Sequence, residues 1–341
     1  MKIQEIGFSE WDTVLPTTGI TVFHTAAALR VLDRHAVGEL RLLGGFKGSQ
    51  PVGLIPVFVR DKSVAKFVFS PPLGFGIRRL GPILFPTSPK QSKQEQVNRE
   101  FMSGVLEELE GSVPTLYFIS CSTAYTDPRP SRWEGLDFEP LFTYQLDLTG
   151  RTRDDLLASF SKSLRREIRH GGETELSVDR RGVDEAKQVY ETTRKRFEDQ
   201  GLNLRISWEY MRDLLYSLDD RARVYTAEDP DGDFLGGITV LYADDTAYFW
   251  KGGTRSSYDG ISVNSLIHWR ILTDILEDPA LESVGQYDLY TANNERLTRY
   301  KSKFGGSLEP YYRIESSSVP MTVAKALYRT VSFNPTLSKW V

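Results

Sequence analysis

The sequence predicts an α+β protein with mixed sheets, built as two successive units. Two observations support this prediction. Short runs of β-branched and aromatic residues alternate with helical patterns along the chain, and the same order of elements occurs twice. A chain of 341 residues also exceeds one typical hydrophobic core, so we expect domains at residues 1–150 and 151–341.

The first unit opens with a hairpin. Residues 38–46, GELRLLGGF, and 51–59, PVGLIPVFV, flank a turn-rich FKGSQ. A further strand at residues 66–70, KFVFS, precedes a helix from Lys93 to Glu110 and a strand at residues 115–120, TLYFIS. A strand, helix, strand connection predicts two parallel strands in a mixed sheet with helices packed on it.

The second unit repeats this order. Residues 222–228, ARVYTAE, and 234–242, FLGGITVLY, form the hairpin around EDPDGD, and TAYFWKGG at residues 246–253 is the next strand. A buried helix follows from Asn264 to Glu277, and QYDLYT at residues 286–291 is the strand after it.

Each unit ends on a short helix and a strand that contains Glu-Pro. FEPLFTYQL at residues 138–146 matches LEPYYRIE at residues 308–315, with Glu139-Pro140 aligned on Glu309-Pro310. Chance likeness between two α/β stretches is the alternative, but the shared order together with the aligned Glu-Pro favours duplication.

An additional amphipathic segment opens the second unit. Residues 151–172 are predicted to form one helix that stops at Gly171 and Gly172, and residues 179–200 a second, charged helix. One side of the first helix is apolar, and the opposite side carries a basic stripe of Lys162, Arg165, Arg166 and Arg169. The stripe is either a solvated helix face or a contact for phosphate groups.

The stretch NNERLTRYKSKFGG, residues 293–306, encloses two lysines between aromatic residues. Asn294 is a suitable N-cap, and Gly305 is a suitable left-handed end for a helix from Glu295 to Phe304. Lys301 and Lys303 then either stabilise a helix C-terminus or serve a function.

Composition narrows the function classes. A net charge of −4 argues against a globally basic nucleic-acid binder, and we expect no DNA partner. Cys121 is the single cysteine, and the N-terminus has no signal-peptide pattern, so we expect a cytoplasmic protein without an integral membrane segment. The four histidines are scattered without zinc-ligand spacing, so we expect no metal and no bound cofactor. Oligomeric state is left open.

Several of these residues occur in the order of a known family. The repeated units, RREIR at residues 165–169, the strand with Tyr287 and Asp288, and YKSKFG at residues 300–305 resemble the FemAB and acetyltransferase-6 branch of the GNAT superfamily. The resemblance implies two tandem GNAT-like domains with a cleft between them. It also implies N-acyltransfer, often of an aminoacyl group from charged tRNA, to a primary amine of a peptidoglycan precursor or another small acceptor.

The resemblance also assigns residue roles. It implies that Lys301 faces the cleft and that the basic stripe binds phosphates. Amine attack on an ester or thioester develops negative charge on the carbonyl oxygen, which a pre-placed cation such as Lys301 would stabilise. Tyr300 and Phe304 are then expected to border the substrate, and Asp288 to be a candidate general base. A hydrogen bond at the end of a strand is the alternative for Asp288.

The donor stays open between aminoacyl-tRNA and acyl-CoA. Acetyl-CoA enzymes of this kind bind pyrophosphate at Q/R-x-x-G-x-G/A before a helix. The corresponding loop here, residues 254–264, offers Arg255 and the single glycine Gly260, which favours a donor held in another way. A competing hypothesis is a catalytically silent tandem module that binds RNA or a phosphorylated ligand.

Overall fold

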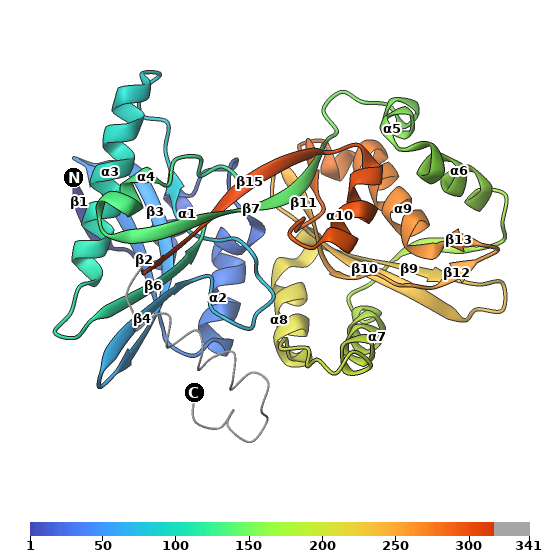
Figure 1. The fold of residues 1–341 in the computed structure, drawn as a ribbon, viewed down its shortest axis with the longest axis horizontal. Helices are drawn as coiled ribbons and strands as arrows, with labels where there is room; N and C mark the ends of the chain where they lie inside the picture. The colour runs from blue at the N-terminus through green and yellow to red at the C-terminus, as the bar shows by residue number, and fades with distance from the viewer. Residues whose placement is uncertain (317–341) are drawn as a thin grey trace.

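The computed structural model describes residues 1–316 as two lobes that lie side by side and are joined by two long strands (Figure 1). The first lobe contains β1 (Lys2–Glu5), α1 (Phe8–Val14), α2 (Ala26–His35), β2 (Glu39–Lys47), β3 (Gln50–Lys62), β4 (Ala65–Ser70), β5 (Ile83–Leu84), α3 (Gln91–Leu109), β6 (Thr115–Ser120) and α4 (Arg129–Trp133). The predicted domain of residues 151–341 extends beyond the described residues.

The connecting strands are β7 (Leu136–Asp147) and β15 (Ser307–Ser316). The second lobe contains α5 (Arg153–Ser159), α6 (Lys162–Gly171), β8 (Ser177–Arg181), α7 (Ala186–Glu198), α8 (Trp208–Leu218), β9 (Ala222–Glu228), β10 (Phe234–Tyr242), β11 (Thr246–Gly252), β12 (Ser257–Tyr258), β13 (Ile261–Ser262), α9 (Val263–Glu277), β14 (Gln286–Asp288) and α10 (Glu295–Lys301), which a 3₁₀ turn extends over Ser302–Phe304.

The predicted α+β class and the twofold repetition are confirmed. The strands form one mixed sheet in the order β1-β2-β3-β4-β6-β15-β7-β14-β11-β10-β9-β8, with β5 paired to β3. Each lobe has three antiparallel strands in sequence and then one parallel pair across a helix: β4 with β6 across α3, and β11 with β14 across α9. Both helices therefore connect parallel strands, as predicted.

The last strands of the two units are exchanged. β15, from the end of the second unit, pairs with β6 of the first lobe, whereas β7, from the end of the first unit, pairs with β14 of the second lobe. The two exchanged strands also pair with each other, and Leu141 lies opposite Tyr311. The Glu-Pro alignment of the two units also matches Leu141 with Tyr311. Equivalent residues of the two units therefore lie opposite each other at this point, which places the pair on the pseudo-twofold axis between the units.

Two helix predictions are wrong in detail. The helix predicted over residues 151–172 is divided into α5 and α6 by extended backbone at Phe160 and Ser161. The Ser161 side chain caps α6, and its N–H donates to Lys303 O at 2.8 Å, so a contact with a distant segment interrupts the helix. The helix predicted over residues 179–200 starts only at Ala186, because residues 177–181 pair with β9 as the edge strand β8.

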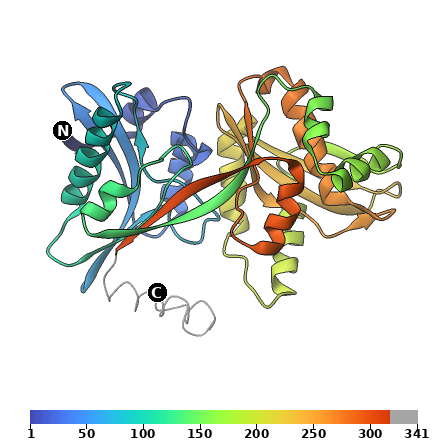
Figure 2. The same cartoon turned by 45° about the horizontal axis from the view of Figure 1, so that its top comes forward.

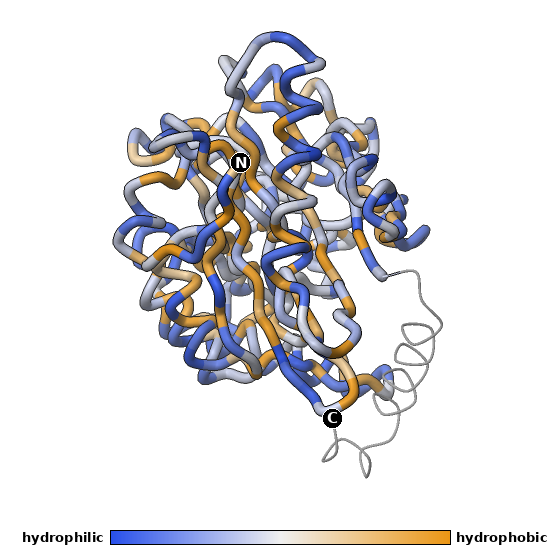
Figure 3. Tube along the Cα trace, turned by 90° about the vertical axis from the view of Figure 1, so that its left-hand side faces the viewer, coloured by the Kyte–Doolittle hydropathy of each residue, from blue (hydrophilic) through white to orange (hydrophobic). Residues whose placement is uncertain are grey.

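The two lobes share a hydrophobic core. α2 of the first lobe packs against α8 of the second, and the Phe23 ring lies 6.2 Å from the Trp250 ring. Figure 2 shows β7 and β15 crossing between the lobes, and Figure 3 shows hydrophobic residues concentrated on the strands, with hydrophilic residues on the outer helices and loops. Burial of apolar surface from both lobes in one cluster fixes their relative position.

Candidate active site

The parallel strands β11 and β14 diverge at the junction of the lobes. Their pairing ends at Tyr248 and Asp288. Beyond that point the chain after β14 leaves β11 and stays beside β7, since Leu289 N donates to Tyr144 O at 2.9 Å. Tyr290 has a φ of 78°, a left-handed conformation that is unfavourable for an aromatic residue. Strained residues of this kind cluster at functional sites, so the divergence is where we place the candidate active site.

A loop of the first lobe holds Tyr290 in this conformation. The Tyr290 hydroxyl donates to Gly76 O at 2.7 Å, and Arg78 N donates to the same hydroxyl at 3.1 Å. The Tyr290 N–H donates to Asp288 Oδ1 at 2.6 Å. The strained segment of the second lobe is therefore fixed by both lobes.

Lys301 lies beside the divergence. Its side chain leaves the C-terminal end of α10, is 4% exposed, and donates from Nζ to Leu289 O at 2.5 Å and to Thr291 O at 2.7 Å. The Phe249 ring centre lies 5.6 Å from Nζ. Burial lowers the pKa of Lys301 to about 8, with Arg78 and Arg79 acting in the same direction and Asp288 opposing them.

The helix that carries Lys301 has the ends that the sequence predicts. The Asn294 side chain accepts from Leu297 N at 3.3 Å, and Gly305 ends the segment with a φ of 69°. Lys301 nevertheless does more than stabilise a helix end, because its ammonium contacts carbonyls of another segment. Lys303 is less buried and takes no part in those contacts.

The aromatic neighbours of Lys301 face the core. Phe304 has no exposed surface and lies 5.5 Å from the Phe160 ring and 5.2 Å from the His268 ring. The Tyr300 hydroxyl accepts from Asn264 Nδ2 at 2.8 Å, and burial raises its pKa. Both rings thus fasten α10 to the rest of the second lobe, and their contact with substrate stays an untested prediction.

Asp288 is a buried acceptor with several donors. Its carboxylate accepts from Thr143 Oγ1 at 2.7 Å and from Gln145 Nε2 at 3.0 Å, in addition to the N–H of Tyr290. Arg79 NH2 of the first-lobe loop lies 2.8 Å from Oδ2, and both side chains of this ion pair are buried. The general-base role of Asp288 stays a prediction. Its contacts are those of a structural anchor between the lobes, and they include the hydrogen bond to backbone that was expected from the sequence as the alternative role.

The basic stripe is present on α6, with one member engaged. Lys162, Arg166 and Arg169 are exposed. Arg165 donates from NH1 to Ala158 O at 3.0 Å and to Phe160 O at 2.7 Å, so it satisfies carbonyls at the end of α5. Phosphate binding by the stripe is untested, and within residues 1–316 no partner is recorded for the other three side chains.

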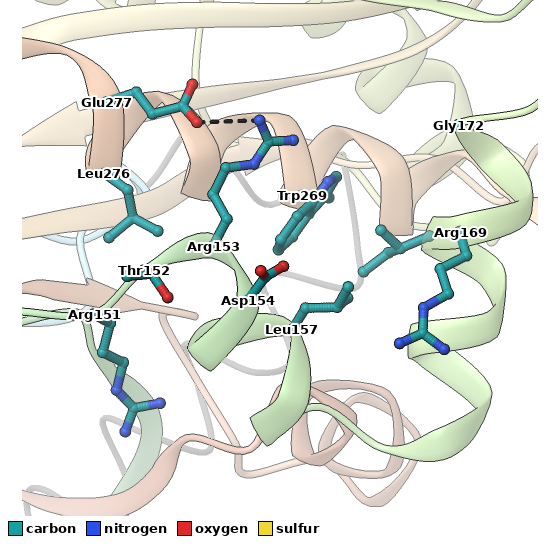
Figure 4. A pocket seen from close by; sticks show the side chains of 11 residues that line it. Arg151, Thr152, Arg153, Asp154, Leu157, Arg169, Gly172, Trp269, Leu276 and Glu277 are labelled. Atoms are coloured by element: carbon teal, nitrogen blue, oxygen red, sulfur yellow. Dashed lines mark hydrogen bonds and ion pairs between the residues drawn. The ribbon is translucent and has the colours of Figure 1, made fainter.

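A hollow of about 760 Å³ adjoins the stripe between α5, α6 and α9 (Figure 4). Arg169 lines one side, Trp269 forms the back, and Arg153 forms an ion pair of 3.1 Å with Glu277 at the rim. A second hollow of about 200 Å³ lies in the first lobe beside α3. Each hollow lies within one lobe, and Lys301 lines neither, so the predicted cleft between domains stays a prediction.

Arg255 lies in an exposed loop near two other arginines. Arg196 of α7 donates to Gly252 O at 3.1 Å and to Gly253 O. Burial lowers the pKa of Arg196, and Arg255 and Arg296 lower it further by repulsion. The loop before α9 is shaped by the small β12–β13 ladder, and Val263 N at the start of α9 already donates to Ser256 O at 3.2 Å. Fewer free backbone donors are left there for a pyrophosphate.

Sequence reasoning missed Lys251 on β11. The residue is partly buried, and burial lowers its pKa to about 7, with Arg78 as the second cause. No motif contains Lys251. The local sequence WKGG shows only a lysine near a strand end, whereas Gly76, against which the lysine packs, is distant in sequence.

Within residues 1–316, no group of three or more His, Cys, Asp or Glu side chains is placed to hold a metal ion. In the same range, no helix combines the length and the apolar character needed to cross a bilayer.

Residues 158–302 match the family model described as acetyltransferase (GNAT) domain. The second lobe is therefore similar to this GNAT domain family over residues 158–302. The resemblance to the FemAB-like branch of the GNAT superfamily is thereby confirmed, and the matched range covers the divergence of β11 and β14 as well as Lys301. No curated protein matches the chain significantly in sequence.

Solved structures show the tandem GNAT fold over nearly the full chain. A structure of FemX superposes with a TM-score of 0.67 at 11% identity, over 97% of this chain and 100% of that one. The C-terminal domain of a putative lysylphosphatidylglycerol synthetase from Agrobacterium fabrum gives 0.57 at 12% identity, over 95% and 96%. A tandem GNAT protein of the clavulanic acid biosynthesis pathway gives 0.50 at 12% identity, over 93% and 99%.

Proposed function

We propose that the protein is an N-acyltransferase that moves an acyl or aminoacyl group to a primary amine of a small or cell-envelope-precursor acceptor. The observation that carries the proposal is the placement of the Lys301 ammonium at the divergence of β11 and β14. Two of its three N–H groups donate to carbonyl oxygens, which fixes its position. The third has no acceptor recorded among residues 1–316 and is available for a substrate oxygen.

A fixed, buried cation suits a reaction in which negative charge grows on a carbonyl oxygen. The amine attacks the ester or thioester carbon, and the carbonyl oxygen takes the electron pair. Because Lys301 is shielded from water, its attraction to this oxygen is stronger than in solvent, and it needs no reorganisation during the reaction. A pKa of about 8 keeps most of the Lys301 population charged at neutral pH.

Charged tRNA is the donor that we favour over acyl-CoA. The loop before α9 has one glycine, Gly260, where the pyrophosphate motif has two, and the first helical N–H is already bonded, which disfavours a tightly held CoA pyrophosphate. The exposed cations of α6 offer phosphate contacts of the kind that a tRNA would use. Because both donors are made in the cytoplasm, we propose that the protein works there.

The two donors can be compared directly. The purified chain is incubated with radiolabelled alanyl-tRNA or acetyl-CoA and with a lysine-containing peptide, putrescine or glycinamide as acceptor. We expect label in the amine product with at least one donor, and expect alanyl-tRNA to give more. Tight tRNA binding without transfer from either donor, to any acceptor, would instead identify a catalytically silent binding module.

A further inference from the structure

Lys251 is turned toward the first lobe by a β-bulge. Lys251 pairs with Thr239 and Phe249 pairs with Val240, so Trp250 is an extra residue in β11. Strict alternation would point Lys251 to the side of Phe249, which packs on His268 of α9. The bulge places it on the side of Trp250 instead. Bulges are frequent beside active sites, where they re-aim a side chain.

The end of the Lys251 side chain lies against Gly76 of the first-lobe loop, and its ammonium is 5.9 Å from the centre of the Trp250 ring. A Cβ at Gly76 would fall 2.5 Å from Lys251 Nζ and 2.5 Å from Ile206 Cδ1, so a larger residue at this position would displace the lysine end. Trp250 Nε1 and the Tyr290 hydroxyl both donate to Gly76 O and hold this loop in place. Lys251 is therefore positioned by the same hydrogen bonds that hold the strained Tyr290.

The charges around Lys251 favour its neutral form. No hydrogen bond or ion pair to its ammonium is recorded among residues 1–316, and Arg78 is the charged group that acts on it. Asp288 is engaged by Arg79, and Tyr210 and Tyr290 stay neutral because burial raises the pKa of each. Lys251 thus lacks the carboxylate partner that keeps most partly buried lysines charged.

We propose that Lys251 is the general base that removes a proton from the acceptor amine, a role that rests on the acyltransferase function proposed above. Phe249 contacts Lys301 on one side of β11, and Lys251 lies on the other. The oxyanion donor and the base would then act from opposite sides of a carbonyl placed at the divergence.

The proton and electron balance of this step is closed. The acceptor enters as an ammonium and gives one proton to neutral Lys251 Nζ. The freed lone pair forms the C–N bond, and the carbonyl pair moves to oxygen. Collapse re-forms the carbonyl and breaks the C–O bond of an aminoacyl ester or the C–S bond of a thioester. The leaving group carries that electron pair and takes the second amine proton, and Lys251 returns its proton to water.

Kinetics of three variants test the role with whichever donor and acceptor pair turns over in the comparison above. Lys251→Met should lower kcat/KM by about 100-fold or more and remove the rise in rate that wild type shows through about pH 7. Lys251→Arg should be equally slow, because a guanidinium keeps its proton. Added imidazole should partly rescue Lys251→Met, and the exposed control Lys187→Met should match wild type.

A second measurement does not depend on turnover. Reductive ¹³C-methylation followed by NMR titration gives the pKa of Lys251. The Lys251 signal is identified as the one that is missing in Lys251→Arg. A pKa near 10 overturns the inference. An unchanged rate and pH profile in Lys251→Met overturns it while leaving the acyltransferase proposal intact. If Lys251→Arg is as active as wild type, the residue acts as a permanent cation that binds an anion, and this result also overturns the general-base inference. Absence of transfer by wild type overturns both proposals.

Discussion

The two halves of the molecule share a topology but differ at the position of Lys301. The segment from α4 into β7 aligns with the segment from α10 into β15 without a gap when the two Glu-Pro pairs are matched. In this alignment Ser131 occupies the position of Lys301. Ser131 is fully buried and uncharged. The family match likewise covers residues 158–302 of the second half. After duplication, one fold can therefore keep the chemistry while its copy keeps only the packing.

The first half still contributes to the site. Its loop after β4 supplies Arg79 to Asp288, Gly76 to Tyr290 and Lys251, and Arg78 to the electrostatic surroundings of both lysines. The difference between the halves is thus a division of labour, in which the second half carries Lys251 and Lys301 and the first half holds Tyr290, Asp288 and Lys251 in place. Each of the following experiments tests one side of that division.

The largest effect should come from breaking the ion pair between the halves. Asp288→Asn leaves Arg79 buried without a counter-charge, and we expect a loss of about 3–5 kcal/mol in the free energy of unfolding. Urea denaturation of this variant, of Arg79→Met and of the double variant gives the coupling energy. Full stability combined with lost turnover in Asp288→Asn would restore the general-base role of Asp288.

The next effect concerns catalysis in the second half. Lys301→Ala should lower kcat by about 100-fold with little change in KM, because its interaction grows as charge develops on the substrate. Lys303→Ala should leave steady-state kinetics unchanged, and Lys301→Arg should rescue only part of the rate. Equal behaviour of the two alanine variants, with folding checked by circular dichroism, would leave Lys301 as a helix-end residue.

The pH dependence separates the charged from the neutral form of Lys301. A stabilising cation requires the protonated form, and its pKa is about 8. The contribution of Lys301 to the rate should therefore be constant below pH 8 and decline as the pH rises through that value, in addition to the rise through about pH 7 expected from Lys251. A rate that instead keeps rising through pH 9 would contradict an electrostatic role for the ammonium.

A smaller effect should follow from crowding the loop of the first half. Gly76 and Gly48 have φ values of 67° and 65°, but only Gly76 faces atoms within 4 Å of an added Cβ. Gly76→Ala should therefore cost about 1–3 kcal/mol more stability than Gly48→Ala, measured by urea denaturation. Equal losses would show that the contact between Gly76 and Lys251 is loose.

The smallest change is expected from the surface cations. Arg166→Glu with Arg169→Glu should weaken tRNA binding several-fold and reduce its salt dependence, with an almost unchanged Tm. The control is Lys90→Glu with Lys93→Glu, two exposed lysines at the start of α3 in the first half, and this variant should bind tRNA as wild type does. If both pairs of substitutions lower affinity alike, the stripe on α6 has no special role.

The sequence predicted what depends on local pattern. The two hairpins, the helices before β6 and β14, the Glu-Pro repeat and the position of Lys301 in a capped helix all follow from periodicity and end signals. It did not predict the exchange of β7 and β15, the break at Phe160, or Lys251, because each depends on a partner distant in the chain. Lys303 contacts Ser161, and Gly76 contacts Lys251, through packing that no local pattern records.

The exchange of the last strands also affects how the protein is made. β6 is synthesised more than 180 residues before β15, the strand that lies beside it in the sheet. During synthesis on a ribosome, the edge of β6 therefore stays open until nearly all of the second half has emerged. An open strand edge of a growing chain can pair with other chains, so the first half is exposed to wrong strand pairing for longer than the first domain of a chain with two independently completed domains.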